Sequence, residues 1–434
     1  MASKTVRYTA QHNLCCGCGV CKGICPKGCI SWEREDGLFL PHIDESLCVS
    51  CGLCTMVCPG LGHTYEAKAT AVTTITGSAL ACYNAWSKDA QLRHVSASGG
   101  VVSTMVRDLI QNGLYDGAFC LDSYDYREQL KTKLFTAEEI EVCWSHSNTP
   151  KSRYLPVSHE NAVAYVKEHR DAKLIIVGTS CAVRGLQAVI KQLNLDREQY
   201  LFIGLFCDKV FNYNVWPYFE DAYADGKTLK SLHFKNKESG GWPGDMKFFP
   251  EIGDAFYVPL EERAKAKAYF MPERCLYCVD KLNVCADISL GDNYTGIDDS
   301  ALGSNSVIVR TQIGLTAWAA AKCSLEVRDI GIVDIQNAQY LEGRLTQLYF
   351  GDLKAERVGG VRLNQGIPRE GKHKEFERAW LMALKKLQAG ALYASEPLRL
   401  AKQIEKDNRK PNAIVQFAKR CYHFVRRRMK RKHR

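Results

Sequence analysis

Short apolar runs, each followed by a polar turn, mark the middle of the chain. Residues 173–178 (KLIIVG) are rich in branched side chains, and residues 182–193 then carry apolar positions at helical spacing. A second apolar run, residues 200–207 (YLFIGLFC), follows soon afterwards. Continuous runs of this length are typical of buried strands, so the pattern predicts two parallel strands joined by a turn and a helix.

An amphipathic helix is predicted within residues 96–113 (SASGGVVSTMVRDLIQNG). Its apolar face consists of Val101, Val102, Met105, Val106, Leu109 and Ile110. Ser98 is the expected N-cap, and Asn112 and Gly113 mark the end. Small residues at the start, Gly99 and Gly100, let exposed N–H groups approach a phosphate, as a nucleotide cofactor requires. A capped helix that only packs on a sheet explains the same residues.

The C-terminal third is predicted to be a helical extension. Residues 372–390 repeat apolar positions at helical spacing and end at Gly390. The expected packing face consists of Phe376, Trp380, Leu381, Leu384 and Leu387. A second amphipathic segment begins at Pro411, with Ile414, Phe417, Cys421 and Phe424 at helical spacing.

The net charge of +10 is concentrated in the C-terminal tail. Nine of the 58 Lys and Arg residues lie between Lys419 and Arg434, which leaves the rest of the chain near neutrality. A basic amphipathic helix of this type suits an anionic membrane surface. A solvated tail is the alternative. No nucleic-acid partner is expected, because no domain that reads nucleic acid accompanies the charge.

The composition, 434 residues with 46% hydrophobic and 24% charged, is that of a globular protein with two or three domains. No apolar run reaches the roughly 18 residues needed to cross a bilayer, and residues 1–13 contain no apolar stretch that could act as a signal segment. We therefore expect a cytoplasmic protein. In that reducing compartment the 20 cysteines are expected to be metal ligands or redox groups rather than disulfides.

Eight cysteines form two copies of the motif C-x2-C-x2-C-x3-C-P. The copies comprise Cys15, Cys18, Cys21, Cys25 and Pro26, and then Cys48, Cys51, Cys54, Cys58 and Pro59. In this motif three thiolates bind one [4Fe-4S] cluster and the fourth binds the other. The spacing therefore predicts two clusters, held by a first set (Cys15, Cys18, Cys21 and Cys58) and a second set (Cys48, Cys51, Cys54 and Cys25).

Zinc is the alternative occupant of these cysteines. Structural zinc sites favour two CxxC pairs separated by a longer spacer, and neither copy has that form. Gly17, Gly19 and Gly52 are expected to let the backbone turn tightly and aim N–H groups at the sulfurs. Cys16 and Cys29 fall outside the motif, and we expect them to pack or hydrogen-bond near the clusters.

Four further cysteines could close a third cluster. Cys181 and Cys207 follow the two predicted strands, at the sheet edge where ligands bind in open α/β proteins, and Cys275 and Cys278 form a CxxC pair. We call these four the third set. Spacing alone leaves open small buried residues, a zinc site or a dithiol that includes Cys285. The remaining cysteines, Cys82, Cys120, Cys143, Cys323 and Cys421, are expected to be buried or surface thiols. Two nearby acids, Asp287 and Asp292, are candidates for turn residues or proton carriers.

Six motifs resemble, in order, the beta-subunit family of coenzyme F-420 hydrogenases and dehydrogenases. They are SGG at 98–100, SRYLPVS at 152–158, VGTSCAVRGL at 177–186, GLFC at 204–207, RCLYC with ADISLGD within 274–292, and GSNSVIVRTQIG at 303–314. Together they span about residues 80–315, with the double ferredoxin motif in front as in several members.

The resemblance implies an α/β core that holds FAD, and a [4Fe-4S] cluster bound by the third set. It also implies a flavin site formed by Ser98, Gly99, Gly100, Lys151, Ser152, Arg153 and Tyr154, of which Lys151, Arg153 and Tyr154 are candidate catalytic residues. Two departures stand out. Ser180-Cys181-Ala182 replaces the Pro-Cys-Gln of many members, and Ser152-Arg153-Tyr154 replaces Ser-Lys-Tyr. Because Arg stays protonated, it cannot donate a proton as Lys does.

The expected fold class is α/β (α+β). We expect a dicluster ferredoxin-like domain (1–75), a core with FAD and [4Fe-4S] (76–335) and a helical extension with a basic tail (336–434). Since a flavin couples two-electron to one-electron chemistry, the first hypothesis is an iron-sulfur flavoenzyme. Its substrate would be a small molecule such as coenzyme F-420, a chlorophyll-like ring or a carbohydrate-linked compound, and its partner a ferredoxin or another redox protein. The second hypothesis is an electron-transfer subunit of a larger complex, and the third is a zinc-stabilised scaffold at the membrane. The location is cytoplasmic or the inner face of the membrane.

Overall fold

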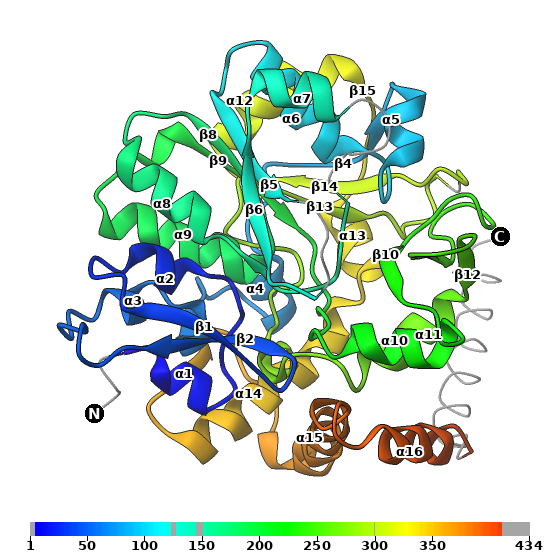
Figure 1. Ribbon diagram of the computed structural model, residues 1–434. Helices are drawn as coiled ribbons and strands as arrows, with labels where there is room; N and C mark the ends of the chain where they lie inside the picture. The colour runs from blue at the N-terminus through cyan, green and yellow to red at the C-terminus, as the bar shows by residue number, and fades with distance from the viewer. Residues whose placement is uncertain (1–4, 123–126, 145–150, 299, 410–434) are drawn as a thin grey trace.

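A mixed sheet forms the centre of the computed structural model, which describes residues 5–122, 127–144, 151–298 and 300–409 (Figure 1). Within these residues the sheet has nine strands, in the order β15 (Leu325–Asp329), β4 (Ala81–Ser87), β14 (Asn305–Val309), β13 (Ile288–Asp292), β9 (Tyr200–Leu205), β8 (Leu174–Gly178), β5 (Gly117–Leu121), β6 (Leu130–Phe135) and β7 (Val157–Ser158). The four strands β13, β9, β8 and β5 are parallel to one another. The predicted α/β (α+β) fold class is confirmed.

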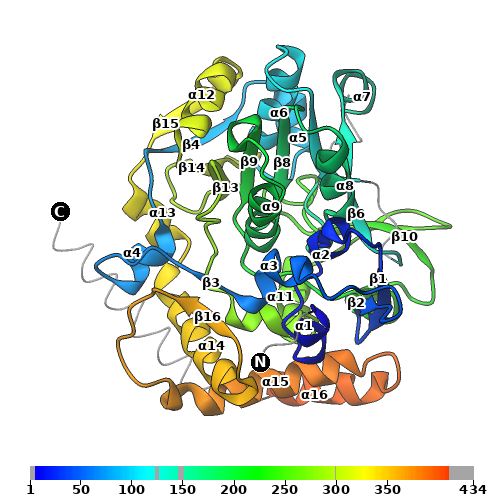
Figure 2. The same cartoon turned by 90° about the vertical axis from the view of Figure 1, so that its left-hand side faces the viewer.

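Helices cover both faces of this sheet (Figures 1 and 2). One face carries α6 (Val101–Gln111) and α12 (Gln312–Ala321), and the other carries α8 (Glu160–Glu168) and α9 (Ser180–Gln192). Side chains alternate along each central strand, so that Ile175 packs toward α6 and α12 whereas Ile176 packs toward α8 and α9. The predicted strand, turn and helix of residues 173–193 are confirmed, as is the second parallel strand.

The cysteine-rich N-terminal segment docks against α8 and α9. Its elements are α1 (Arg7–Gln11), α2 (Val20–Ile24), β1 (Ile30–Glu35), β2 (Leu38–Ile43), α3 (Leu53–Met56) and η1 (Pro59–Leu61). The backbone N–H of His159 donates to the carbonyl of Cys18 at 2.9 Å. Gly19 has a φ of +78°, and a Cβ atom there would lie 2.1 Å from Ser158 Oγ. Only glycine therefore permits this close docking.

Smaller elements surround the central sheet. They are β3 (Gly62–Thr64), α4 (Ala71–Thr76), α5 (Ala90–Val95), α7 (Ala137–Cys143), η2 (Arg197–Gln199), α10 (Val215–Tyr223), α11 (Leu260–Lys267), η3 (Glu273–Tyr277), η4 (Lys322–Ser324), and the antiparallel strands β10 (Leu229–His233), β11 (Met246–Pro250) and β12 (Phe256–Val258). The C-terminal part adds α13 (Ile332–Ala338), η5 (Leu341–Arg344), α14 (Leu345–Val358), β16 (Arg362–Gln365), η6 (His373–Phe376), α15 (Glu377–Ala391) and α16 (Pro397–Arg409).

The C-terminal extension packs on the N-terminal segment and on η3 (Figure 2). Strand β16 pairs in parallel with β3, and the hydroxyl of Tyr8 donates to the carbonyl of Gly359 at 2.5 Å. A shared apolar core includes Leu14, Leu276, Tyr277, Phe350, Leu353 and Trp380. The extension therefore covers the region where the cysteine-rich segment meets the central domain.

The helix predicted for residues 372–390 is present as η6 and α15, with one error in its packing face. Trp380 and Leu387 are buried, and Phe376 and Leu384 pack beside them, but Leu381 is 41% exposed. Leu381 lies one residue, and therefore about 100° around the helix, from Trp380. The segment predicted from Pro411 onward, with Ile414, Phe417, Cys421 and Phe424, lies outside the described residues.

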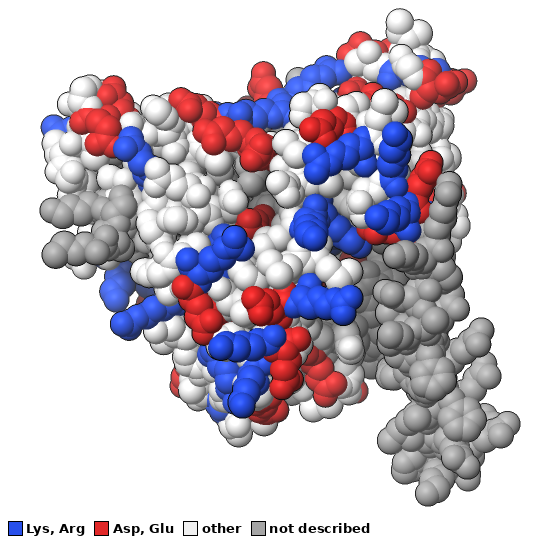
Figure 3. Space-filling model, turned by 90° about the horizontal axis from the view of Figure 1, so that it is seen from below, with Lys and Arg blue, Asp and Glu red and all other residues white. Residues whose placement is uncertain are grey.

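Charges of both signs are interspersed over the face formed by the lower helices (Figure 3). This agrees with the near-neutral charge of the chain before its basic tail. No helix in the described part of the chain combines the length and apolar character that crossing a bilayer would require.

Candidate functional site

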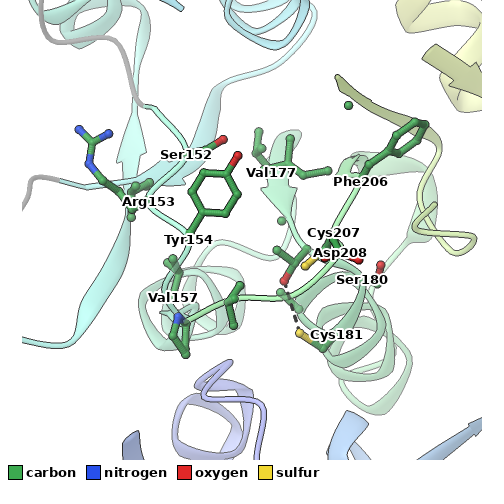
Figure 4. Close-up of a pocket in the computed structure, with 18 of the residues that line it drawn as sticks. Ser152, Arg153, Tyr154, Val157, Val177, Ser180, Cys181, Phe206, Cys207 and Asp208 are labelled. Atoms are coloured by element: carbon green, nitrogen blue, oxygen red, sulfur yellow. Dashed lines mark hydrogen bonds between the residues drawn. The ribbon is translucent and has the colours of Figure 1, made fainter. Parts of the chain in front are cut away.

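A cavity of about 320 Å³ lies at the carboxyl ends of the parallel strands (Figure 4). Its wall combines the start of α6, residues 151–157, the turns after β8 and β9, η3 and the end of β13. Ends of neighbouring parallel strands meet at one edge of a sheet, which explains why segments distant in sequence converge there.

All four cysteines of the third set line this cavity, namely Cys181, Cys207, Cys275 and Cys278. Cys181 lies in the first turn of α9, and Cys207 follows β9. Cys275 lies in η3, and Cys278 directly follows it. Cys285 does not line it. Burial raises the pKa of Cys275 to about 12, whereas a hydrogen bond from Cys16 lowers the pKa of Cys181 to about 6.

The first and second sets are each brought together as well. The second set, Cys25, Cys48, Cys51 and Cys54, lines a smaller cavity of about 20 Å³ together with Cys29. In the first set the charges of Cys15, Cys18 and Cys58 all act on Cys21. Gly17, Gly19 and Gly52 adopt positive φ, and Gly17 N–H donates to Cys15 Sγ at 3.4 Å, so the predicted turns and the N–H aimed at a sulfur are confirmed.

The three sets follow one another through the molecule. Cys21 of the first set packs in one apolar cluster with Cys25 and Cys54 of the second. Cys18 of the first set lines the large cavity beside Cys181 of the third, and the charge of Cys181 acts on Cys18. In space, the second set therefore adjoins the first set, and the first set adjoins the third set, which lines the cavity. Cys16 and Cys29 lie among these sulfurs as predicted, the latter with its Sγ 3.4 Å from Cys25 Sγ.

The third set fits a [4Fe-4S] cluster in its donor chemistry. It offers four enclosed thiols, and the adjoining guanidinium of Arg274 has buried Nε and Nη1 atoms without a hydrogen-bond partner. A negatively charged thiolate cluster supplies the partner that such a cation needs. Across the described residues, no three His, Cys, Asp or Glu side chains are grouped closely enough to hold a single metal ion. The ligands of a [4Fe-4S] cluster bind different irons, so this finding does not bear on them.

The start of α6 differs from the prediction. Its N-cap is Gly100, with a φ of +80°, and not Ser98, whose hydroxyl donates to the carbonyl of Ser304. Ser98 and Gly100 line the cavity, but Gly99 does not. A Cβ atom on Gly99 would lie 2.7 Å from Asn305 Oδ1, so this glycine serves close packing. The predicted end at Asn112 and Gly113 is confirmed.

Lys151, Ser152, Arg153 and Tyr154 all line the cavity. The Tyr154 ring points into it, whereas the Arg153 side chain extends away from the cysteines (Figure 4). Tyr154 adopts a φ of +53°, which is uncommon for a bulky residue. Burial, and then the charge of Arg153, lower the pKa of Lys151 to about 8. This segment therefore places a phenol ring and an amine with a lowered pKa at one wall.

Sequence reasoning missed several lining residues. His159 lines the cavity, and burial lowers its pKa to about 4. Its position directly after the SRYLPVS motif could have pointed to it. Lys235 also lines the cavity and pairs with Asp292. Although burial lowers it, the Asp292 carboxylate holds the pKa of Lys235 above its usual value. No sequence pattern marked Lys235.

Asp287 and the cysteines outside the three sets lie in varied surroundings. Asp287 is fully buried and accepts hydrogen bonds from Arg197 and Thr311, so it is a structural acid and not part of the cavity wall. Cys120 is buried and lines the cavity, Cys82 is half-buried and Cys323 is exposed. Cys143 ends α7, and Cys421 lies outside the described residues.

Comparison with known proteins identifies several relatives. One of the subunits of F(420)H(2) dehydrogenase from Methanosarcina mazei is 25% identical over 330 residues, which cover 74% of this chain and 85% of the relative. The beta subunit of coenzyme F420 hydrogenase from Methanosarcina barkeri is 26% identical over 254 residues, covering 56% and 79%. Coenzyme F420-dependent sulfite reductase of Methanocaldococcus jannaschii is 27% identical over 327 residues, covering 70% of this chain and 45% of the relative.

A solved structure is also similar, that of the F420-reducing [NiFe] hydrogenase complex from Methanosarcina barkeri. The TM-score is 0.49 with 20% identity, over 68% of this chain and 98% of that one.

Family profiles match most of the central domain. The N-terminal part of the coenzyme F420 hydrogenase/dehydrogenase beta subunit matches residues 82–163, and its C-terminal part matches residues 171–331. A 4Fe-4S binding domain matches residues 40–67. The chain therefore belongs to the coenzyme F420 hydrogenase/dehydrogenase beta-subunit family and is an oxidoreductase-type protein with an iron-sulfur domain.

Proposed function

We propose that this chain is a flavoenzyme that links hydride chemistry on a small molecule to single-electron transfer through three [4Fe-4S] clusters. The observation that supports this most directly is the shared cavity, which has the start of α6 and residues 151–154 on one wall and the third set on another. FAD, when bound there, would supply hydride transfer and would exchange single electrons with a cluster. The same cavity thus adjoins the residues proposed to hold the flavin and the cysteines proposed to hold a cluster.

The residues of the cavity have distinct roles in this proposal. The N–H groups at the start of α6 and the Lys151 ammonium attract a phosphate group. Tyr154, Val177 and Phe206 provide an apolar wall that excludes water (Figure 4). Asp292 and Lys235 form an ion pair at the cavity, and this pair holds a proton within reach of a bound substrate.

The second set is the proposed point of contact with a ferredoxin or another redox protein. Cys51 is exposed, and exposed apolar side chains flank it, namely Leu47, Val49 and Met56, at 53%, 58% and 52%. Exposed apolar groups around a cluster ligand favour the close approach that a protein partner needs. Electrons would pass between this surface and the cavity through the first and third sets.

A second candidate function is that of an electron-transfer subunit whose catalytic partner is another polypeptide. Two relatives are named as subunits, of F(420)H(2) dehydrogenase and of coenzyme F420 hydrogenase, which favours this alternative. The same relatives support coenzyme F420 as the substrate to examine first, ahead of a chlorophyll-like ring or a carbohydrate-linked compound.

Anaerobic stopped-flow spectroscopy of the purified chain tests the proposal. We expect a brown protein with extractable FAD whose flavin is reduced by at least one two-electron donor, reduced coenzyme F420 first among them. Reduction only after addition of a partner protein would support the electron-transfer role within a larger complex instead. A colourless protein with stoichiometric zinc would contradict both and would support the scaffold.

The basic tail suggests a place for this reaction. We propose a cytoplasmic protein that associates with the inner face of a membrane, because nine Lys and Arg residues gather between Lys419 and Arg434. Sedimentation with anionic liposomes should be strong at low salt and weak at high salt. No binding at either salt concentration would contradict the association.

A further inference from the structure

Arg274 lies between the first and the third sets. It belongs to η3, and its Nη2 donates at 3.4 Å to the carbonyl of Pro59, the residue after Cys58. It directly precedes Cys275 of the third set and lines the cavity together with Cys181 and Cys278. One guanidinium therefore adjoins cysteines of two separate sets.

This guanidinium differs from other arginines that are enclosed nearby. Arg184 pairs with Asp280, and Arg344 pairs with Asp208. In the described part of the chain no carboxylate forms an ion pair with Arg274, and its buried Nε and Nη1 atoms make no hydrogen bond. A buried cation without a counter-charge is strongly unfavourable. The negative charge that balances it lies at the neighbouring cysteines, as thiolates or as the groups that these thiolates bind.

We propose that Arg274 is the shared counter-charge of two adjacent [4Fe-4S] clusters, those of the first and third sets, and that it raises the reduction potential of both. The inference rests on the proposed function, because it requires clusters at both sets. A cluster that takes up one electron gains one negative charge, with no ligand bond broken and no proton required. A fixed positive charge beside it favours the reduced form.

The position between the sets has a consequence for transfer from one cluster to the other. When a single electron moves from the first set to the third, the charge of Arg274 stabilises it at both positions. A cation beside only one cluster would hold the electron there. A shared cation shifts both potentials in the same direction, so it does not by itself favour either cluster as the electron's resting place.

Redox titration of the anaerobically purified full-length chain, followed by electron paramagnetic resonance, tests this role. In Arg274→Gln we expect two of the three midpoint potentials to become more negative, and the third, that of the second set, to stay unchanged. The second-set potential is identified by its absence in Cys51→Ala. Arg274→Lys keeps the charge and should retain potentials near those of the parent. Lys27→Gln is the matched control, because Lys27 lines the second-set cavity but is exposed, so that water and salt screen its charge.

The outcomes separate this inference from a purely structural role. Unchanged potentials in Arg274→Gln would overturn it, and a shift of only one potential would overturn the shared role. Loss of iron from both Arg274→Gln and Arg274→Lys would show that the shape of the guanidinium matters rather than its charge, and would also overturn it. Loss of iron in Arg274→Gln alone would support it. A parent protein without clusters would instead contradict the proposed function itself.

Discussion

The three cysteine sets differ in how well their sequence spacing predicts them. The first and second sets could be predicted from two local motifs, because three ligands of each proposed cluster lie on one short loop. The third set depends on three segments that only the fold brings together, so spacing left it open and the family resemblance was needed. His159 and Lys235 carry no pattern of their own, and their places in the cavity wall follow from the fold alone.

Replacing single cysteines tests the third set. Cys207→Ala should lose about one third of the iron, because removing one ligand opens one of three proposed clusters. Cys285→Ala is the matched control and should keep its full iron content, since Cys285 does not line the cavity. Iron analysis of both variants after anaerobic purification checks this. Equal iron loss in the two variants would contradict the assignment.

Lys151 should give ligand binding a pH dependence. Its ammonium is present below a pKa of about 8 and is lost above it, so attraction for an anionic ligand is present at low pH and falls as the pH rises. We expect the affinity for FAD to weaken about tenfold between pH 6.5 and pH 9.5, as expected for loss of a charged hydrogen bond. Fluorescence titration of the apoprotein with FAD at the two pH values measures this affinity.

Two variants control this titration. Lys151→Met should bind FAD weakly at both pH values, because the titrating charge is gone. Lys265→Met removes a charge from the partly exposed end of α11 and should leave the pH dependence intact. A parent-like pH profile in Lys151→Met would show that another group is responsible.

At the level of elements, apolar patterning predicted the presence of the buried strands and helices more accurately than their caps and packing faces. The run of residues 173–178 became β8 because both of its faces are buried. Ser98 did not cap α6, because Ser304 engages its hydroxyl and Gly100 makes the turn. Leu381 did not join the packing face of α15, because it lies about 100° around the helix from the buried Trp380. Tertiary contacts decided each of these details.

Gly19 tests how the N-terminal segment docks on α8. Gly19→Ala should lower the free energy of unfolding by about 3 kcal/mol, because it combines an unfavourable positive φ with overpacking against Ser158. Gly28→Ala shares the positive φ but has open space around its Cβ position, so it should cost only about 1 kcal/mol. Denaturant unfolding of both variants gives the comparison, and similar losses would contradict the role of close packing.

At the scale of the whole molecule, the C-terminal extension covers the cysteine-rich junction. Trp380 is 4% exposed and packs with Leu14 and Tyr277, so Trp380→Ala should destabilise the protein by about 3–5 kcal/mol and accelerate iron loss. Leu381→Ala, one residue along the same helix, should change stability by less than about 0.5 kcal/mol because Leu381 is exposed. Thermal unfolding and chelator-driven iron release measure both effects. Equal behaviour of the two variants would contradict the packing.

The pairing of β16 with β3 joins Thr64 to Gln365, which are 301 positions apart. During synthesis the ligands of the second set leave the ribosome together, whereas the junction behind them stays uncovered until β16, α14 and α15 have emerged. Under the proposed function, the second set can therefore receive iron early, whereas the sets next to the cavity are enclosed only after the C-terminal extension has folded.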